Sequence, residues 1–273
     1  MDEQVAKEYE ELKKQGRIWD ERDERYKERT RKIKFPRPDR SIIQQFLDLE
    51  DITDTVSNIL DTLGVVSMVP ASYLSPSMPN RRIVGPAITM RCIPEAKTVT
   101  QIILEKRPPW IARPICYLAE PGDVLVIDQG GRLDMGGYGD MACATAKSCG
   151  IVGTINHGAM RDIAGIRKLD YPVWCRGITP TSAGFRVEVA ELNGSISLGT
   201  VPVRPGDIIM ADDSGVCVVP IDAIEFVLEK LKAIAADEAR QRDLINKNLS
   251  PAELQERYKD GRKIIRQDNW SSK

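Results

Sequence analysis

At two places in the chain, twenty residues apart, a strand or a glycine-rich turn is followed directly by a helix. At the first, Gly136–Gly139 precedes Asp140; at the second, the apolar run from Ile151 leads through Asn156-His157-Gly158 to Arg161-Asp162. Free N–H groups and a partial positive charge at a helix N-terminus attract a carboxylate. Arginine binds a carboxylate through paired hydrogen bonds, and aspartate can hold a hard divalent cation. The pattern therefore predicts a site for a small oxo acid and a metal ion.

Each part of this pattern also has a purely structural interpretation. Gly136, Gly137 and Gly139 lack the spacing of a nucleotide-binding loop and alone indicate a tight turn. Asp140 alone is typical of a helix N-cap. An adjacent Arg161-Asp162 pair is typical of a surface ion pair or a helix start. Its position after a strand, together with Asp140, favours a functional role.

Two other polar features are more typical of structure than of chemistry. The sole histidine, His157, cannot supply a multi-histidine zinc site, and no cysteine cluster replaces one. No serine lies in a Gly-x-Ser-x-Gly turn. We therefore interpret His157 as a hydrogen-bonded residue at a strand end. Asp212–Gly215 could bind a cation, but the segment favours a hairpin turn before the apolar strand 215–219.

Composition limits the classes of function. A net charge of -1 and a pI of about 6.1 give no basic excess for nucleic acid. No run of about 20 apolar residues predicts a membrane span, and the acidic N-terminus does not resemble a secretory signal. The six cysteines form no Cys-x-x-Cys pair, which favours reduced thiols. We therefore expect a cytoplasmic protein that binds neither nucleic acid nor membrane.

We predict three parts along the chain: a charged helical arm over 1–40, an α/β core over 41–220 and a helical extension over 221–273. The arm holds 13 basic and 11 acidic residues, with sparse apolar anchors. These anchors are Val5, Tyr9, Leu12, Ile18, Trp19 and Tyr26. The arm is either a solvated extension or a segment laid across a neighbouring subunit. We favour the second, because Ile18 and Trp19 would otherwise be exposed.

The core mixes strands and helices without a regular βαβ rhythm. Pro121-Gly122-Asp123 and Pro205-Gly206-Asp207 each precede a short apolar strand. Residues 221–246 have the spacing of a long amphipathic helix. We expect an α/β domain with mixed sheets rather than a doubly wound sheet.

Together these phrases resemble the RraA-like family. It unites class II 4-hydroxy-4-methyl-2-oxoglutarate / 4-carboxy-4-hydroxy-2-oxoadipate aldolases with the regulator of ribonuclease E activity A. The family pattern, Asp followed after twenty residues by Arg-Asp, is met by Asp140 and Arg161-Asp162. Further family-like phrases are Val84–Thr89, the two Pro-Gly-Asp turns and Gly158–Met160. The resemblance covers about residues 45–248.

The resemblance implies a swivelling β/β/α domain, assembled as a homotrimer or homohexamer with active sites between subunits. It also implies Mg²⁺ or Mn²⁺ as cofactor. Backbone amides of Met141 and Ala142, with Gly139 beside them, would bind the carboxylate of a small 2-oxo acid. Arg161 would contact the substrate oxygens, and Asp162 would be the metal ligand.

The implied activity is metal-dependent cleavage of a carbon–carbon bond through a pyruvate enolate, by retro-aldol cleavage, decarboxylation or both. The base would be a water held by Asp140 or by Glu238, the latter from a neighbour's C-terminal helix. Family aldolases often carry an acidic residue where this chain has Gly165, which weakens the link to the known aldolase substrates. The alternative is a non-enzymatic regulator of a ribonuclease that docks through the arm.

Overall fold

A large mixed sheet organises the chain. The computed structural model describes residues 2–18, 23–110, 112–247 and 249–258. Ten strands form the sheet, in the order β1-β12-β11-β3-β4-β6-β7-β2, with β5 attached to β6 and β8 to β3. Their bounds are β1 Met68–Pro70, β2 Ser75–Pro76, β3 Ile83–Pro94, β4 Val124–Asp128, β5 Gly136–Tyr138, β6 Gly153–Met160, β7 Val173–Ile178, β8 Val187–Leu192, β11 Ile208–Ala211 and β12 Gly215–Val219.

The long strand β3 joins the two halves of this sheet. Its first residues pair antiparallel with β11, and its middle pairs parallel with β4. Strands β4, β6 and β7 continue the parallel set, so their carboxyl ends lie at one edge. Antiparallel β8 pairs with the last part of β3. The mixed α/β fold expected from the sequence is confirmed.

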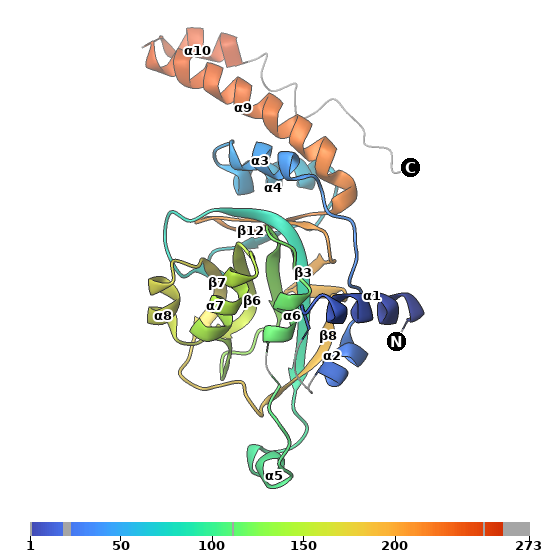
Figure 1. Cartoon of the computed structure of the whole chain (residues 1–273). Coiled ribbons are helices and arrows are strands. Elements are labelled where there is room, and N and C mark those ends of the chain that lie inside the picture. Colours follow the sequence, from blue (N-terminus) through green and yellow to red (C-terminus); the bar gives the residue numbers. More distant parts are fainter. Residues whose placement is uncertain (1, 19–22, 111, 248, 259–273) are drawn as a thin grey trace.

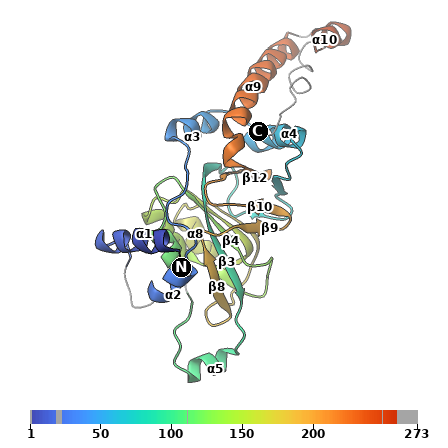
Figure 2. The same cartoon turned by 90° about the vertical axis from the view of Figure 1, so that its right-hand side faces the viewer.

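Side chains of the parallel strands alternate between two cores. In β4, Leu125 and Ile127 pack in the core that includes helix residues such as Cys143 and Ile166. Val124 and Val126 pack on the other face, against the hairpin of β9 (Ile196–Leu198) and β10 (Val201–Val203). Both faces are therefore covered, which explains why β4 is apolar except at its last residue. The layers are sheet, sheet and helix (Figure 2).

Short helices cover the face of the parallel strands that carries Leu125 and Ile127. They are α6 (Arg113–Tyr117), α7 (Asp140–Ser148) and α8 (Ile163–Lys168). Figure 1 shows all three on the same side of β6 and β7. Helix α5 (Val99–Leu104) lies apart, at the lower end in Figure 1. It begins with a capping box in which Thr98 and Gln101 bond each other's backbone amides.

A third core lies against β11 and β12. Helices α3 (Arg40–Leu47), α4 (Ile52–Thr62) and α9 (Ile224–Asn246) pack there. The predicted helix over 221–246 begins as a 3₁₀ turn, η1 (Ile221–Ala223), before α9. Only the first half of α9 has a buried stripe, and its second half projects from the body with α10 (Pro251–Tyr258) in Figure 1. None of the described helices is long and apolar enough to cross a membrane.

The N-terminal arm packs on its own chain. It forms α1 (Glu3–Lys14) and α2 (Asp23–Arg29). Val5, Tyr9 and Leu12 make a buried stripe that belongs to the same core as Met90 and Ile115. Ile18 and Tyr26 join this core, while Trp19 lies outside the described residues. The expectation of a solvated extension was therefore wrong, and a contact of the arm with a neighbouring subunit stays a prediction. The predicted division at residues 40 and 220 stays a prediction.

A buried ion pair holds the chain where the arm ends. Arg37 donates two hydrogen bonds of 2.9 Å to Asp123, whose side chain is 1% exposed. Burial raises the pKa of Asp123 above its usual value, and the Arg37 guanidinium opposes that rise. A buried carboxylate depends on such a partner, because removing one partner leaves an uncompensated charge.

Arg37→Ala is therefore expected to lower the free energy of unfolding by about 3 kcal/mol, because Asp123 loses its ion partner. Denaturant unfolding followed by circular dichroism measures this change. Arg40→Ala is the matched control, since Arg40 is exposed and only reaches the Pro121 carbonyl at 3.4 Å. It should stay within about 0.5 kcal/mol of wild type. Equal, small effects of both variants would contradict this role of the pair.

Candidate active site

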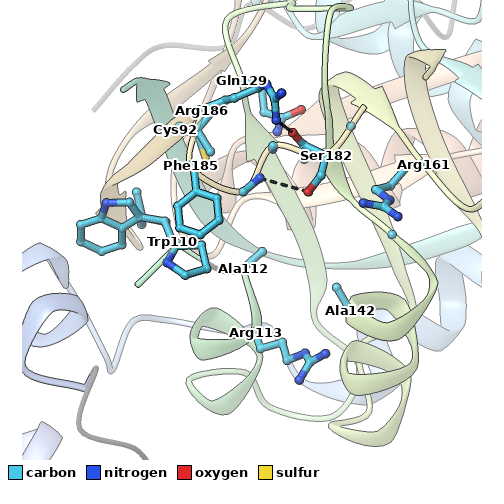
Figure 3. Close-up of a pocket in the computed structure, with 18 of the residues that line it drawn as sticks. Cys92, Trp110, Ala112, Arg113, Gln129, Ala142, Arg161, Ser182, Phe185 and Arg186 are labelled. Carbon is cyan, nitrogen blue, oxygen red and sulfur yellow. Dashed lines mark hydrogen bonds between the residues drawn. The ribbon is translucent and has the colours of Figure 1, made fainter. Parts of the chain in front are cut away.

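A cavity of about 700 Å³ opens beside the end of β6 and the start of α7 (Figure 3). Its polar end is lined by Gly139, Asp140, Met141, Ala142, Arg161 and Asp162. Its other end is mostly apolar, with Met90, Cys92, Trp110, Phe185, Val187 and Val189. All the predicted site residues except Glu238 therefore line one cavity.

Arg161 and Asp162 follow β6 and begin α8. The Arg161 amide donates to the Tyr138 carbonyl at 3.1 Å, which ties this turn to β5. Asp162 has a left-handed backbone (φ 56°), so the chain turns sharply into α8. Nε of Arg161 donates to Oδ2 of Asp162 at 3.0 Å, and both side chains are 35% exposed. The pair remains accessible from the cavity.

Asp140 occupies the first turn of α7 and lies near Asp162. The helix's own bonding begins with the Cys143 amide on the Gly139 carbonyl, at 2.9 Å. A Cβ added to Gly139 would lie 2.5 Å from Oδ2 of Asp162. Glycine at 139 therefore lets the Asp162 carboxylate approach the start of α7.

The Met141 amide has a partner already. It donates to Oδ1 of Asp140 at 2.6 Å, so a substrate carboxylate must compete with Asp140 for this donor. Ala142 is the next residue of the same first turn, ahead of the helix's own bonds. The anion site stays a prediction, and an aspartate side chain accepts from one of its two predicted donors.

Gly165 has a physical explanation in this arrangement. A Cβ at 165 would lie 2.7 Å from Oδ2 and 2.9 Å from Cβ of Asp140. The Asp140 side chain thus fills the space that a side chain at 165 would enter. This chain places an acidic group there from α7 rather than from α8.

The residues at the polar end suit a hard cation that keeps water and substrate ligands. Asp162 and Asp140 offer two carboxylates, and Mg²⁺ is commonly bound by one or two carboxylates plus substrate oxygens and water. Among the described residues, no group of three or more His, Cys, Asp or Glu side chains could form a closed protein site. Asp162 remains the predicted ligand.

Glu238 lies elsewhere in the chain. It is half-buried on the second half of α9 and is not among the cavity residues. Its predicted role required the helix of a neighbouring subunit, so it stays a prediction.

The apolar wall contains residues that the sequence did not reveal. Trp110 packs edge-on against Tyr26 of α2, with ring centroids 5.1 Å apart. The Arg25 guanidinium lies 4.3 Å from the Trp110 ring centre and donates to the Pro108 carbonyl. The arm therefore supports one wall of the cavity. The proline pair before Trp110 was the available signal, since it limits where that tryptophan can point.

His157 belongs to a buried network outside this cavity. Its Nδ1 lies 3.1 Å from Oδ1 of Asp128, and its Nε2 lies 2.9 Å from the Tyr73 hydroxyl. Burial alone would raise the pKa of Asp128, but bonds from His157 and the Gly130 amide outweigh it and hold the pKa below its usual value. The prediction that His157 is hydrogen-bonded is confirmed, but the residue lies inside β6 rather than at a strand end.

Asp212–Gly215 is also the expected turn. It connects β11 to β12, and the Asp212 amide donates to the Gly215 carbonyl at 3.0 Å. Oδ1 of Asp212 accepts from the Ser214 amide at 2.9 Å, which closes the turn.

Asp128→Asn is expected to lower the free energy of unfolding by about 1–3 kcal/mol at pH 7, because a buried bonded carboxylate is replaced. A folded-state pKa below the unfolded one means that this stabilisation is present above about pH 4 and is lost as the pH falls through the folded value. The difference from wild type should therefore narrow in unfolding curves between pH 7 and pH 3. Asp61→Asn, at an exposed residue of α4, is the control. A difference in the free energy of unfolding between wild type and Asp128→Asn that does not change with pH would contradict this role of the Asp128 carboxylate.

Comparisons with known proteins show which family and which proteins this chain resembles. Residues 51–218 match the RraA-like family model, described as Aldolase/RraA. A Halalkalibacterium halodurans protein named "Putative 4-hydroxy-4-methyl-2-oxoglutarate aldolase" is 37% identical over 191 residues, which is 70% of this chain and 83% of that protein. Protein DlpA of Legionella pneumophila is 32% identical over 223 residues, 80% of this chain. This chain spans only 34% of the length of DlpA.

Solved structures share the fold. An uncharacterized protein from Pseudomonas syringae pv. tomato has a TM-score of 0.67 at 25% identity, covering 81% of this chain and all of that one. Streptomyces coelicolor RraAS2, described as an unusual member of the RNase ES inhibitor RraA protein family, has a TM-score of 0.62 at 25% identity. That match covers 79% of this chain and 100% of RraAS2.

Proposed function

Because the chain belongs to the RraA-like family, we propose that it is a divalent-metal-dependent lyase that cleaves a carbon–carbon bond of a 2-oxo acid. One observation supports this most. Arg161, Asp162, Asp140 and the first turn of α7 line a single cavity, although they come from two separate stretches of chain, the end of β6 and the start of α7. Relatives named as aldolases support the same class of reaction.

Arg161 would bind and orient the substrate. Its Nε is bonded to Asp162, which leaves its terminal nitrogens for oxygens of a ligand in the cavity (Figure 3). The Ala142 amide would hold the carboxylate, while the Met141 amide stays bonded to Oδ1 of Asp140. Mg²⁺ or Mn²⁺ held by Asp162 would supply positive charge where the enolate forms. The fixed guanidinium supplies charge at the same end of the ligand.

Asp140 would move the proton. In a retro-aldol cleavage, the 4-hydroxyl loses its proton, C4 becomes a carbonyl, and the C3–C4 bonding pair passes into the pyruvate enolate. Oδ1 of Asp140 is held by the Met141 amide, so Oδ2 is available as the base, directly or through a water. Decarboxylation of oxaloacetate forms the same enolate without a base. One cavity can therefore serve both reactions.

The assembly belongs to the proposal too. We infer a homotrimer or homohexamer in which Glu238 of a neighbour reaches this cavity. The second half of α9 supports this, because it projects beyond its own core and, past Leu231, buries only Leu244. The alternative, a regulator of a ribonuclease that docks through the arm, has less support, because the arm's anchors are buried in their own core.

Asp162→Ala is expected to reduce pyruvate release from oxaloacetate and from 4-hydroxy-2-oxo acids at least 100-fold with Mg²⁺ or Mn²⁺ present, because the metal loses its ligand. A coupled assay for pyruvate measures the rate. Asp213→Ala is the matched control, since Asp213 lies on the β11–β12 turn and outside this cavity. The proposal is wrong if wild type releases no pyruvate, or if Asp162→Ala keeps the wild-type rate.

Gly165→Ala is expected to lower retro-aldol turnover about ten-fold, since its Cβ forces the Asp140 carboxylate to move. Oxaloacetate decarboxylation should fall less, because it requires no base. The measurement is kcat for both substrates, with thermal unfolding to check the fold. At Gly177, a Cβ meets only the end of the Leu133 side chain at 3.1 Å, so Gly177→Ala is the control. An equal loss on both substrates would count against Asp140 as the base.

A further inference from the structure

Gln129 is a buried amide without a protein partner for its oxygen. It follows β4 directly, is 3% exposed, and lines the cavity (Figure 3). Its Oε1 is buried and accepts no hydrogen bond from any described residue. Leaving a buried amide oxygen unpaired costs free energy, so such groups are expected to have a partner in the working protein.

Two glycines make room for this amide. A Cβ added to Gly137 would lie 1.4 Å from Nε2 of Gln129, and one added to Gly158 would lie 2.3 Å from its Oε1. Gly137 belongs to β5 and Gly158 to β6, so two strands both lack side chains where the amide lies. No other residue fits either position without moving Gln129. The amide is therefore held in a shaped niche rather than free to turn to solvent.

The niche adjoins the polar end of the cavity. Gly136, the neighbour of Gly137 in β5, lies against Arg161, since a Cβ there would be 2.8 Å from Cβ of Arg161. Adjacent residues of one strand thus contact Arg161 and Gln129, and both side chains line the same cavity. A ligand that fills this cavity would therefore contact both side chains.

The chemistry of the amide selects its partner. Oε1 needs a donor, and the adjacent Nε2 offers hydrogens to an acceptor. A ketone or carboxylate oxygen only accepts, whereas a hydroxyl both donates and accepts. The apolar wall of the cavity offers no charged group to the hydroxyl. Burial, aided by the charge of Asp128, raises the pKa of Cys92 to about 12, so that thiol stays neutral.

We propose that Gln129 binds the 4-hydroxyl of the substrate and makes the cavity selective for 4-hydroxy-2-oxo acids over oxo acids without that hydroxyl. This inference rests on the proposed function, since it places the cleavable end of the same substrate beside Gln129. In the bound substrate the single hydroxyl proton lies on Oε1 of Gln129, and it turns to the base described above when cleavage begins. Gln129 therefore binds and orients the substrate and does not take the proton.

The test compares two acids that differ by the hydroxyl, 4-hydroxy-2-oxoglutarate and 2-oxoglutarate, with Mn²⁺ present. KM for pyruvate release from the first is set against Ki of the second as a competitor. Wild type should favour the hydroxylated acid about ten-fold or more, as one good hydrogen bond provides. Gln129→Leu should abolish that preference. Gln129→Glu, which keeps an acceptor oxygen in the same place, should retain it.

Each outcome decides one of the two proposals. If wild type cleaves the hydroxylated acid but Gln129→Leu keeps the preference, the assignment of Gln129 fails and the lyase stands. If wild type cleaves nothing, thermal stabilisation by the two acids replaces kinetics. If wild type is then stabilised more by the hydroxylated acid and Gln129→Leu is not, the role of Gln129 is supported while the lyase proposal fails. If wild type is stabilised equally by the two acids, both proposals fail. Should Gln129→Leu not fold, Gln129→Met, of similar length, carries the same expectation.

Discussion

The parallel pairing of β4 with β6 is the constraint on which the site depends. Its register sets Asp128 opposite His157, so the residues that follow both strands emerge at the same edge. From that edge the chain supplies Gln129 after β4 and Arg161-Asp162 after β6. A shift of this register would separate Gln129 from Gly158, while the pairing of β5 with β6 sets the start of α7 beside Arg161. The buried bond between Asp128 and His157 opposes such a shift.

Close approach of backbone to polar side chains is the second theme of this region. Gly137 and Gly158 admit the Gln129 amide, Gly139 admits Asp162, and Gly165 admits Asp140. At each of these positions glycine is required by the close approach of a side chain, since none of the four has a left-handed backbone. The glycines before α7 are therefore explained by the side chains that approach their backbone.

Much of the polar end could be predicted from sequence, because Asp140 and Arg161-Asp162 each lie at a local change from strand or turn to helix. Gln129 and Trp110 could not be, since their roles depend on strands and helices distant in the chain. The arm's apolar stripe at Val5, Tyr9 and Leu12 was readable as a buried face. Which surface buries it is a tertiary property, so the sequence did not show that this stripe packs on the core of its own chain.

The support of Trp110 by Arg25 and Tyr26 bears on how substrates are assigned among relatives. The family match begins at residue 51, so both supporting residues lie upstream of the segment that the family model matches. Homologues that agree throughout this segment can still differ in the residues that pack against this tryptophan. Transfer of a substrate name between them therefore requires comparing their leading segments as well as their common core.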